Sequence, residues 1–161
     1  MEEKIVYFTN EGKKNTRKVV DLAIERAKER NIKKFIVSST KGGTAEAFLE
    51  KVRGTDIQLI VVPWQYGIKK EGNPFPSELA DKLRKENHVV HFATMLFHTD
   101  SLYGNEAPKA LANILRIFGQ GMKVVVEIMM MACDGGWVDI GEKAVVVSGT
   151  GSGADTAVVA T

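Results

Sequence analysis

Ser38-Ser39-Thr40-Lys41-Gly42-Gly43-Thr44-Ala45 is the stretch that decides how this chain is interpreted. It follows the apolar run Phe35–Val37 and precedes the amphipathic segment Glu46–Val52. Glycines let the backbone come close to a ligand, and the start of a helix offers unpaired N–H groups and a partial positive charge. A strand that ends in hydroxyls and glycines and then opens a helix therefore predicts an anion-binding loop.

Working outward from this stretch, apolar runs alternate with amphipathic segments along the whole chain. Strands are expected at Ile5–Phe8, Phe35–Val37, Ile57–Val62, His88–Phe92, Ala144–Val147 and Thr156–Ala160. Helices are expected at Thr16–Arg30, Thr44–Val52, Ser77–Lys85, Glu106–Phe118 and Met122–Ala132, with Asn15 and Ser77 as N-caps. The alternation predicts an α/β fold, a three-layer α/β/α sandwich around a mostly parallel sheet. The last two strands are joined by a loop without a helix, so the last strand is expected to be antiparallel.

Composition places the chain among ordinary soluble proteins. Its 161 residues, 44% apolar and 26% charged, predict a single domain over residues 1–161. A net charge of +2 does not favour nucleic acid or a membrane as partner. The single Cys133 is expected to be a buried, inert thiol, and without a signal peptide or a long apolar stretch the expected location is the cytoplasm. The sequence leaves open whether a further C-terminal segment follows the last strand.

A second glycine-rich loop, Ser148–Thr156, has the same chemistry as the first. The P-loop pattern fails for the first stretch because Lys41 precedes the glycines. Gly149–Ala154 matches the dinucleotide-binding pattern, but too few residues follow for the helix and acidic residue that an NAD site requires. Two alternatives without a ligand stay open: an ordinary strand-to-helix turn capped by Thr44, and a simple hairpin bend at the second loop.

Ligands of open α/β sheets bind beyond the carboxyl ends of the parallel strands. The loops expected there carry most of the hydroxyl and glycine residues and several aromatic rings, which fits a ligand with a phosphate at one end and a ring at the other. The candidate cofactor-binding residues are Thr9, Asn10, Ser38, Ser39, Thr40, Lys41, Gly42, Gly43, Thr44, Trp64, Gln65, Tyr66, Gly67, His98, Thr150, Gly151, Ser152, Gly153, Ala154, Asp155 and Thr156.

The histidines do not predict a metal site. His88 and His91 are three positions apart on the expected strand and so face opposite sides. His98 follows that strand near Asp100 and is the best candidate for a ligand contact or an acid–base role, with an ordinary surface histidine as the alternative. No metal is expected, and no catalytic residue is assigned.

The order of these motifs resembles the C-terminal domain of pyruvate kinase. In that family a helix leads into an apolar strand and a Thr-x-Ser-Gly-x-Ser/Thr-Ala loop, as Thr16–Arg30 here leads into Phe35–Val37 and Ser39–Ala45. Near the end of that domain an apolar strand runs into a Gly-x-x-x-Gly-Ser-Gly-x-x-x-Thr loop and a last strand. Val145–Val147 and Gly149–Thr156 follow the same order, with slightly shorter spacing.

In pyruvate kinases the two loops bind the phosphates of a sugar bisphosphate effector, so the resemblance implies anion contacts at Ser39–Thr44 and Gly151–Asp155. It implies no kinase activity, because the catalytic barrel is absent from this chain. Asp155 adds a negative charge beside the second loop, which favours a ligand with one phosphate and several hydroxyls over a bisphosphate.

The chain is most similar to standalone, mostly archaeal proteins of this fold that are associated with flavin mononucleotide (FMN). FMN is therefore the implied cofactor, with Trp64 and Tyr66 as candidate neighbours of its ring. The main hypothesis is an FMN-binding protein, with flavin-dependent oxidoreductase activity left open. The alternatives are a non-catalytic module that senses a phosphorylated metabolite and a self-assembling structural domain; a homo-oligomer is compatible with each.

Overall fold

The structure, a computed structural model, describes residues 4–68, 72–100, 104 and 106–161. The 3-10 helix η1 (Gly12–Asn15) leads into α1 (Thr16–Arg30), and α2 (Gly43–Val52) and α3 (Ser77–Lys85) follow. The second half contains η2 (Leu96–His98), α5 (Ala107–Arg116) and α6 (Gln120–Asp134). The strands are β1 (Lys34–Ser38), β2 (Gln58–Val62), β3 (Val89–Val90), β4 (Ala144–Ser148) and β5 (Thr156–Ala160).

The strands form one sheet in the order β3-β2-β1-β4-β5. β1 pairs in parallel with β2 and with β4, and β2 pairs in parallel with β3. β5 returns antiparallel beside β4, with Ala144 opposite Ala160 and Ser148 opposite Thr156. The predicted α/β class and the antiparallel last strand are therefore confirmed.

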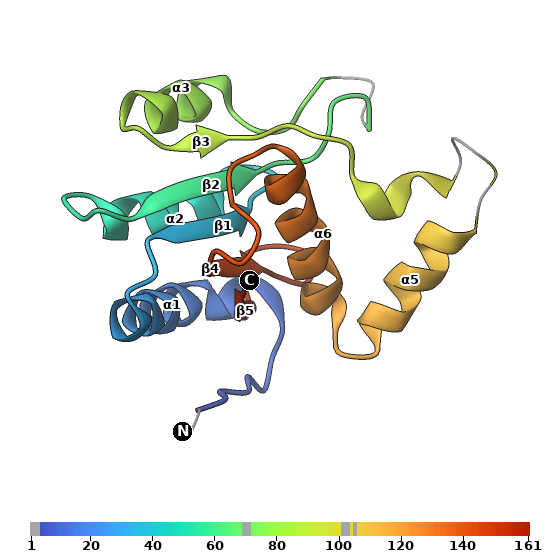
Figure 1. Ribbon diagram of the computed structural model, residues 1–161, viewed down its shortest axis with the longest axis horizontal. Coiled ribbons are helices and arrows are strands. Elements are labelled where there is room, and N and C mark those ends of the chain that lie inside the picture. Colours follow the sequence, from blue (N-terminus) through green and yellow to red (C-terminus); the bar gives the residue numbers. More distant parts are fainter. Residues whose placement is uncertain (1–3, 69–71, 101–103, 105) are drawn as a thin grey trace.

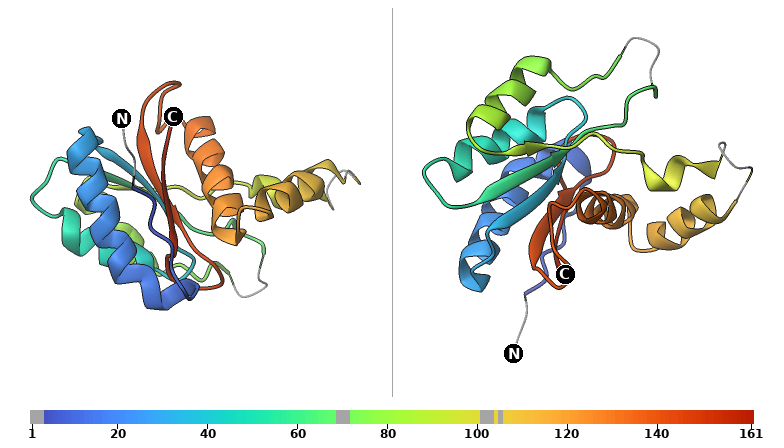
Figure 2. Two further views of the ribbon diagram at one scale, coloured as in Figure 1. Left: turned by 90° about the horizontal axis from the view of Figure 1, so that it is seen from below. Right: turned by 45° about the horizontal axis from the view of Figure 1, so that its top comes forward.

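Two apolar cores lie on opposite faces of the sheet, because successive strand residues point to opposite sides. Phe35 and Val37 pack with residues of α1, α2 and α3 on one face. Ile36 and Val146 pack with residues of α6 on the other. The left view of Figure 2 shows the sheet nearly edge-on between α1 and α6, and Figure 1 shows η2 and α5 extending outward beyond α6.

The strand predicted at Ile5–Phe8 is wrong. No residue from 4 to 11 is in a strand, and Ile5 and Tyr7 are 71% and 86% exposed. Only Phe8 packs against the first core, where it is partly buried. An apolar β-prone segment becomes a strand only when a neighbouring strand completes its hydrogen bonds, and this segment pairs with none of the five described strands.

The strand predicted at His88–Phe92 shrinks to Val89–Val90. Asn87 has a left-handed conformation, and the His88 N–H returns to the Leu83 carbonyl, so the turn that leaves α3 extends to His88. Beyond β3, Phe92 places its ring 4.9 Å from that of Tyr66. The His91 N–H still donates to the Val61 carbonyl, so the backbone pairing with β2 extends one residue beyond β3.

The helices follow their predicted ranges closely, and Asn15 occupies the predicted N-cap position of α1, but the cap predicted at Ser77 is wrong. Asn15 makes no capping bond to α1 and donates instead to the Asn10 carbonyl, and Ser77 is the first residue of α3 while Pro76 occupies the cap position. Pro108 lies in the first turn of α5, where its missing N–H costs nothing. Among the described residues no helix combines the length and apolarity needed to cross a bilayer.

Candidate functional site

The candidate site lies where β1, β2 and β3 end. Because these strands are parallel, their carboxyl ends lie on one side of the sheet, and their arrowheads point the same way in Figure 1. The loops that leave them contain Ser39–Gly42, Trp64–Gly67 and the segment that enters η2. The loop between β4 and β5 also begins at this edge, since β4 runs parallel to β1.

The first loop is held in place by its own hydroxyl and by α3. Ser39 is 5% exposed; its N–H donates to the Val62 carbonyl, and its Oγ accepts from the Ala45 N–H at 3.2 Å. Gly42 is the N-cap of α2 with a φ of +92°, and a Cβ there would lie 2.6 Å from Cδ2 of Leu79. The loop is therefore pressed against α3 at a point that only glycine accommodates.

Two backbone donors at the start of α2 remain unused. Within the described residues the N–H groups of Gly43 and Thr44 have no hydrogen-bond partner. The next N–H, that of Ala45, donates to Oγ of Ser39. A Cβ added to Gly43 would meet nothing within 4 Å, so there is open space beside this residue, whereas Thr44 is 6% exposed. Thr44 lies inside the helix and does not cap it, so the simple capped-turn alternative does not describe this loop.

The second loop is organised around its own carboxylate. Oδ2 of Asp155 accepts from the N–H groups of Gly12 at 2.7 Å and Thr150 at 3.0 Å, and Oδ1 accepts from the Thr156 hydroxyl at 2.8 Å. The Ala154 N–H donates to Oγ1 of Thr16. The loop thus forms a closed connection between β4 and β5 that is docked on η1 and α1, and Asp155 already occupies an anion position within it.

The surroundings of Asp155 affect its ionisation. Burial acts to raise the pKa of Asp155, but the donors on Gly12, Thr156 and Thr150 together outweigh burial and hold this pKa below its usual value of 3.8. A carboxyl whose pKa is lower in the folded than in the unfolded state stabilises the fold above the unfolded-state pKa. That contribution is lost as the pH falls through the folded-state pKa, so the sensitive range lies below about pH 4.

Asp155→Asn is therefore expected to lower the free energy of unfolding by about 2 kcal/mol at pH 7, because charge-assisted hydrogen bonds are lost. The variant is also expected to lose less further stability than the parent chain between pH 5 and pH 3. Urea unfolding at several pH values measures both effects. Asp139→Asn on the exposed turn before β4 is the control and should change stability by less than about 0.5 kcal/mol. An Asp155→Asn variant with the parent's pH dependence would contradict the assignment.

The aromatic candidates form a cluster next to the first loop. The Tyr66 ring, on a residue that is 64% exposed, lies 4.9 Å from that of Phe92, which in turn lies 6.3 Å from that of Phe75. Phe75 precedes Pro76, which would be 3.3 Å from a Cβ at Gly42. A continuous chain of packed residues therefore connects the exposed Tyr66 ring to the loop with the free donors.

The remaining candidates are placed as follows. Oε1 of Gln65 accepts from the Met95 N–H at 2.6 Å and so ties the loop after β2 to the segment that enters η2. Trp64 is partly exposed, and its carbonyl accepts from Asn73. Further candidate cofactor-binding residues lie at exposed or partly exposed positions: Thr9, Asn10, Ser38, Thr40, Lys41, Gly67, Gly151, Ser152 and Gly153. Thr9 and Asn10 precede η1, which the second loop contacts through Gly12.

One buried polar cluster was missed at the sequence level. Lys123 and Glu127 on α6 are 1% and 2% exposed and form an ion pair at 2.6 Å. The other carboxylate oxygen of Glu127 accepts from the Phe97 N–H at 2.9 Å and lies 3.2 Å from Nδ1 of His98. Two charges four residues apart in an otherwise apolar helical segment are the signal that could have revealed this cluster.

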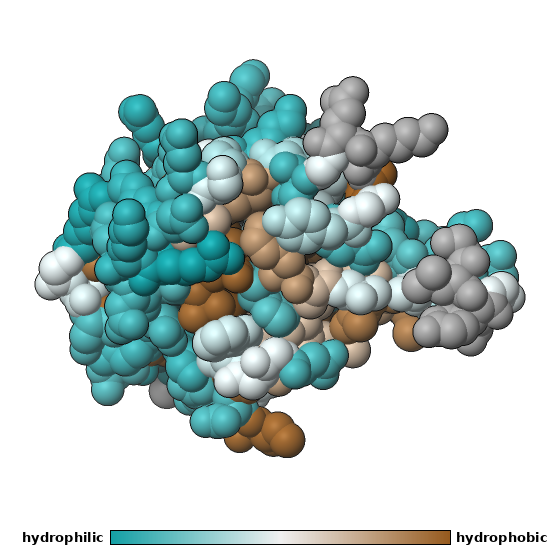
Figure 3. Space-filling view, turned by 90° about the horizontal axis from the view of Figure 1, so that it is seen from above, coloured by the Kyte–Doolittle hydropathy of each residue, from teal (hydrophilic) through white to brown (hydrophobic). Residues whose placement is uncertain are grey.

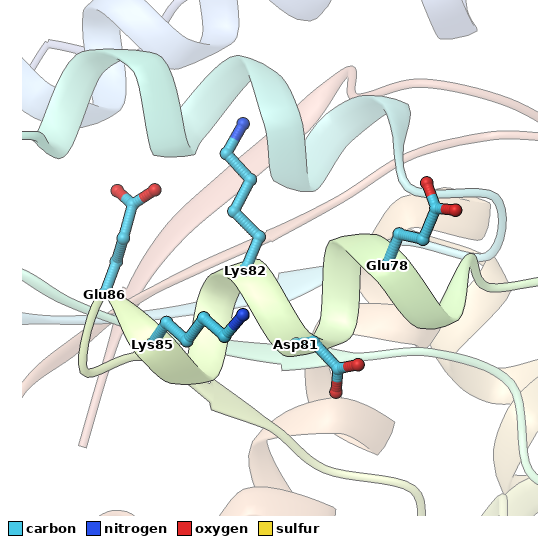
Figure 4. Close-up of a pocket in the computed structure, with 5 residues that line it drawn as sticks. All are labelled: Glu78, Asp81, Lys82, Lys85 and Glu86. Atoms are coloured by element: carbon cyan, nitrogen blue, oxygen red, sulfur yellow. The ribbon is translucent and has the colours of Figure 1, made fainter.

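Of the two described surface hollows, one lies away from these loops and the other lies beside the segment that leaves β3. The first, of about 410 Å³, is lined by Glu78, Asp81, Lys82, Lys85 and Glu86 of α3 and its C-terminal end. Figure 4 shows Lys82 and Glu86 pointing toward α2 and Asp81 pointing away from it, and Figure 3 shows mainly hydrophilic side chains on this side of the molecule. The charged lining and open shape are typical of a solvated helix face rather than a ligand pocket.

The second hollow, of about 180 Å³, lies between the segment after β3 and the last turns of α6, where Ala93, Leu96 and Met131 contribute to its lining. Cys133, near the end of α6, is partly buried, and burial together with Asp134 and Glu142 raises the pKa of its thiol. In the part of the chain that the structure describes, no three His, Cys, Asp or Glu side chains are grouped to bind a metal ion.

Fold and site define the class as an α/β sandwich domain with glycine-rich loops at the carboxyl edge of its sheet. No protein-family model matches the chain. Among solved structures it is similar to a pyruvate kinase of Cryptosporidium parvum, at 16% identity and a TM-score of 0.49, over 90% of this chain and 22% of that chain. Two further structures of Cryptosporidium parvum pyruvate kinase, one in complex with ADP, match at 19% identity and a TM-score of 0.44, again over 90% of this chain. The chain spans less than a quarter of the length of these enzymes.

Proposed function

We propose that this chain binds a phosphorylated small molecule at the carboxyl edge of its sheet, with the phosphate on the loop Ser39–Thr44. The observation that carries the proposal is the pair of unpartnered N–H groups on the exposed Gly43 and the buried Thr44 at the start of a ten-residue helix. Such donors, together with the helix dipole, favour an anion. Oγ of Ser39 accepts from the N–H of Ala45, so the N–H groups of Gly43 and Thr44 are the donors of this helix start that remain for the ligand.

The second loop favours one phosphate over two. Three donors already satisfy Asp155, and its negative charge would repel a second phosphate. The exposed Tyr66 ring offers a surface on which a flat ring can stack. We therefore propose FMN as the ligand, since it combines one phosphate, a hydroxylated chain and a flat ring. The identity of the ring rests on the resemblance of the chain to standalone proteins of this fold that are associated with FMN.

A second candidate is a module that senses a phosphorylated metabolite without transforming it. It is favoured by the openness of the first loop: neither described hollow lies there, and Gly43 faces free space. A surface that holds a phosphate and leaves the rest of the ligand accessible suits an effector as well as a cofactor.

Thermal-shift and fluorescence titrations with FMN, riboflavin, ribose 5-phosphate and inorganic phosphate separate the two candidates. If FMN is the ligand, it should raise the Tm and lose fluorescence on binding, whereas riboflavin should bind at least about tenfold more weakly because it lacks the phosphate. Stabilisation by ribose 5-phosphate but not by FMN would favour the sensing module. If none of the four compounds stabilises the chain, the phosphate site is refuted.

Gly43→Ala is expected to leave the free energy of unfolding unchanged within about 0.5 kcal/mol, because the new methyl group meets no atom. The same methyl group would project into the space assigned to the phosphate, so the affinity for FMN or ribose 5-phosphate should fall about tenfold or more. Isothermal titration calorimetry on the parent chain and the variant measures this effect. Gly67→Ala, on the open loop after β2, serves as the glycine control. Unchanged affinity in Gly43→Ala would exclude this loop as the phosphate site.

A further inference from the structure

The cluster of Lys123, Glu127 and His98 connects a buried ion pair to the protein surface. Glu127 is 2% exposed, whereas the His98 side chain is 45% exposed. Nδ1 of His98 faces the carboxylate at 3.2 Å, and within the described residues its Nε2 has no hydrogen-bond partner. The imidazole therefore presents Nε2 to solvent while its other nitrogen is held from inside.

The partners of Glu127 determine which nitrogen of His98 carries the proton. An ionised carboxylate only accepts hydrogen bonds, so Nδ1 of His98 must be the donor of this pair. Nζ of Lys123 and the Phe97 N–H occupy the same carboxylate at 2.6 Å and 2.9 Å and keep it in place. Nζ of Lys123 also lies 5.3 Å from the centre of the Phe97 ring. In its neutral form, His98 thus keeps the proton on Nδ1 and an accepting lone pair on Nε2.

The other two histidines have the opposite arrangement. Nδ1 of His88 accepts from the Leu59 N–H, and Nδ1 of His91 accepts from Nε1 of Trp137. Both neutral rings therefore carry their proton on Nε2. Nε2 of His91 is buried without a partner in the described structure, whereas Nε2 of His98 faces solvent. His98 is thus the one of the three histidines whose geometry presents a basic nitrogen outward.

His98 lies in the segment that leaves the carboxyl end of β3, and β3 is parallel to β2, which is parallel to the strand that leads into the first loop. η2 follows β3, and Gln65 fastens the entry to η2 onto the loop after β2. Gly121, half a turn before Lys123, packs against Thr156 at the end of the second loop, and its carbonyl accepts from Ser148. Figure 1 shows η2 between α6 and α5. The ion pair and His98 are therefore built into the edge at which the loops lie.

We propose that His98 is a proton-transfer residue, with Glu127 and Lys123 as positioning residues, and that this edge acts on a small phosphorylated molecule whose hydroxyl or ring N–H group gives up a proton. In this step Nε2 takes a proton from the ligand atom, and the resulting imidazolium, bonded through Nδ1–H to the Glu127 carboxylate, returns it to the ligand or to water. The ligand class rests on the function proposed above. The cluster of His98, Glu127 and Lys123 is tested on the ligand-free protein. A negative result for the cluster therefore does not refute the proposed ligand, and a negative result for the ligand does not refute the cluster.

The first test is ¹⁵N NMR of the histidine rings at a pH where they are neutral. His98 should show the Nδ1–H tautomer, and His88 and His91 should show the Nε2–H tautomer as internal references. The paired variant Lys123→Met/Glu127→Met removes the carboxylate without leaving its charged partner buried, and it should shift His98 toward the Nε2–H form while the other two rings stay unchanged. A parent His98 with Nε2–H, or a tautomer that does not respond to the paired variant, would refute the positioning role.

The second test measures the reactivity of Nε2 with p-nitrophenyl acetate as probe. The Nε2 lone pair attacks the acetyl carbon, the ester C–O bond breaks to release p-nitrophenolate, and water hydrolyses the acetyl-imidazole to acetate. His98→Gln should lower the protein-dependent turnover at least about tenfold. The paired variant should lower it several-fold, and His91→Gln should leave it unchanged in protein whose fold is verified by circular dichroism. Turnover that persists in His98→Gln would exclude His98 as the reactive group.

Discussion

Lys123→Met is expected to lower the free energy of unfolding by about 3 to 5 kcal/mol, because it leaves the Glu127 carboxylate buried without its cation. The side chain of Lys123 is 1% exposed, so water cannot replace the lost ammonium group without opening the packing of α6 against η2. Methionine has nearly the same length, so the loss reports on charge rather than on a cavity. Urea unfolding followed by circular dichroism measures the change.

The paired variant Lys123→Met/Glu127→Met distinguishes this explanation from a general intolerance of the position. With both charges removed, the Phe97 N–H is the main group left without its acceptor, and the expected loss is only about 1 to 2 kcal/mol. The double variant should therefore be more stable than the single one. Lys143→Met, on an exposed position before β4, is the surface control. A double variant less stable than Lys123→Met would contradict the ion-pair account.

Gly153→Ala is expected to cost about 3 to 5 kcal/mol of unfolding free energy, the sum of left-handed strain and overpacking. Gly153 has a φ of +73°, and a Cβ there would lie 2.5 Å from Cα of Lys13 and 2.5 Å from Oγ1 of Thr16. Since Cα of Lys13 belongs to the backbone of η1, the clash cannot be relieved by rotating a side chain. The second loop would have to separate from η1 and α1.

Gly151→Ala in the same loop provides the control. Its φ of +71° is nearly the same, but a Cβ there meets nothing within 4 Å. It should therefore show only the backbone strain, about 1 to 2 kcal/mol. Thermal and urea unfolding of both variants measure the difference, which isolates the contact between the second loop and η1. Equal losses for the two variants would show that this contact contributes no stability.

The sequence by itself determined the order of the elements and the architecture of the sheet. The helices and the strands β1, β2, β4 and β5 follow from local periodicity, glycine and proline positions and the lengths of the connections, all of which act over a few residues. The antiparallel β5 follows from a connection too short for a parallel crossover. The same local signals marked the loop Ser39–Thr44, whose free donors depend mainly on its own glycines and hydroxyls.

What the sequence did not determine depends on partners far along the chain. Ile5–Phe8 has the composition of a strand, but no neighbouring strand pairs with it, and hydrogen-bond pairing is a property of the whole sheet. No signal in the sequence indicated that the carboxylate of the second loop, on Asp155, accepts a hydrogen bond from the N–H of Gly12, 143 residues away.

The buried ion pair shows the same limit most clearly. Lys123 and Glu127 have the spacing of an ordinary exposed pair on a helix, and only the packing of η2 against α6 removes them from water. An ion pair with this spacing contributes little to stability at the surface. When the pair is buried, removal of one partner is costly, because the remaining charge is left unpaired in a medium of low dielectric constant. Tertiary structure therefore decided which of the polar residues are buried and hold the fold together and which remain exposed to solvent.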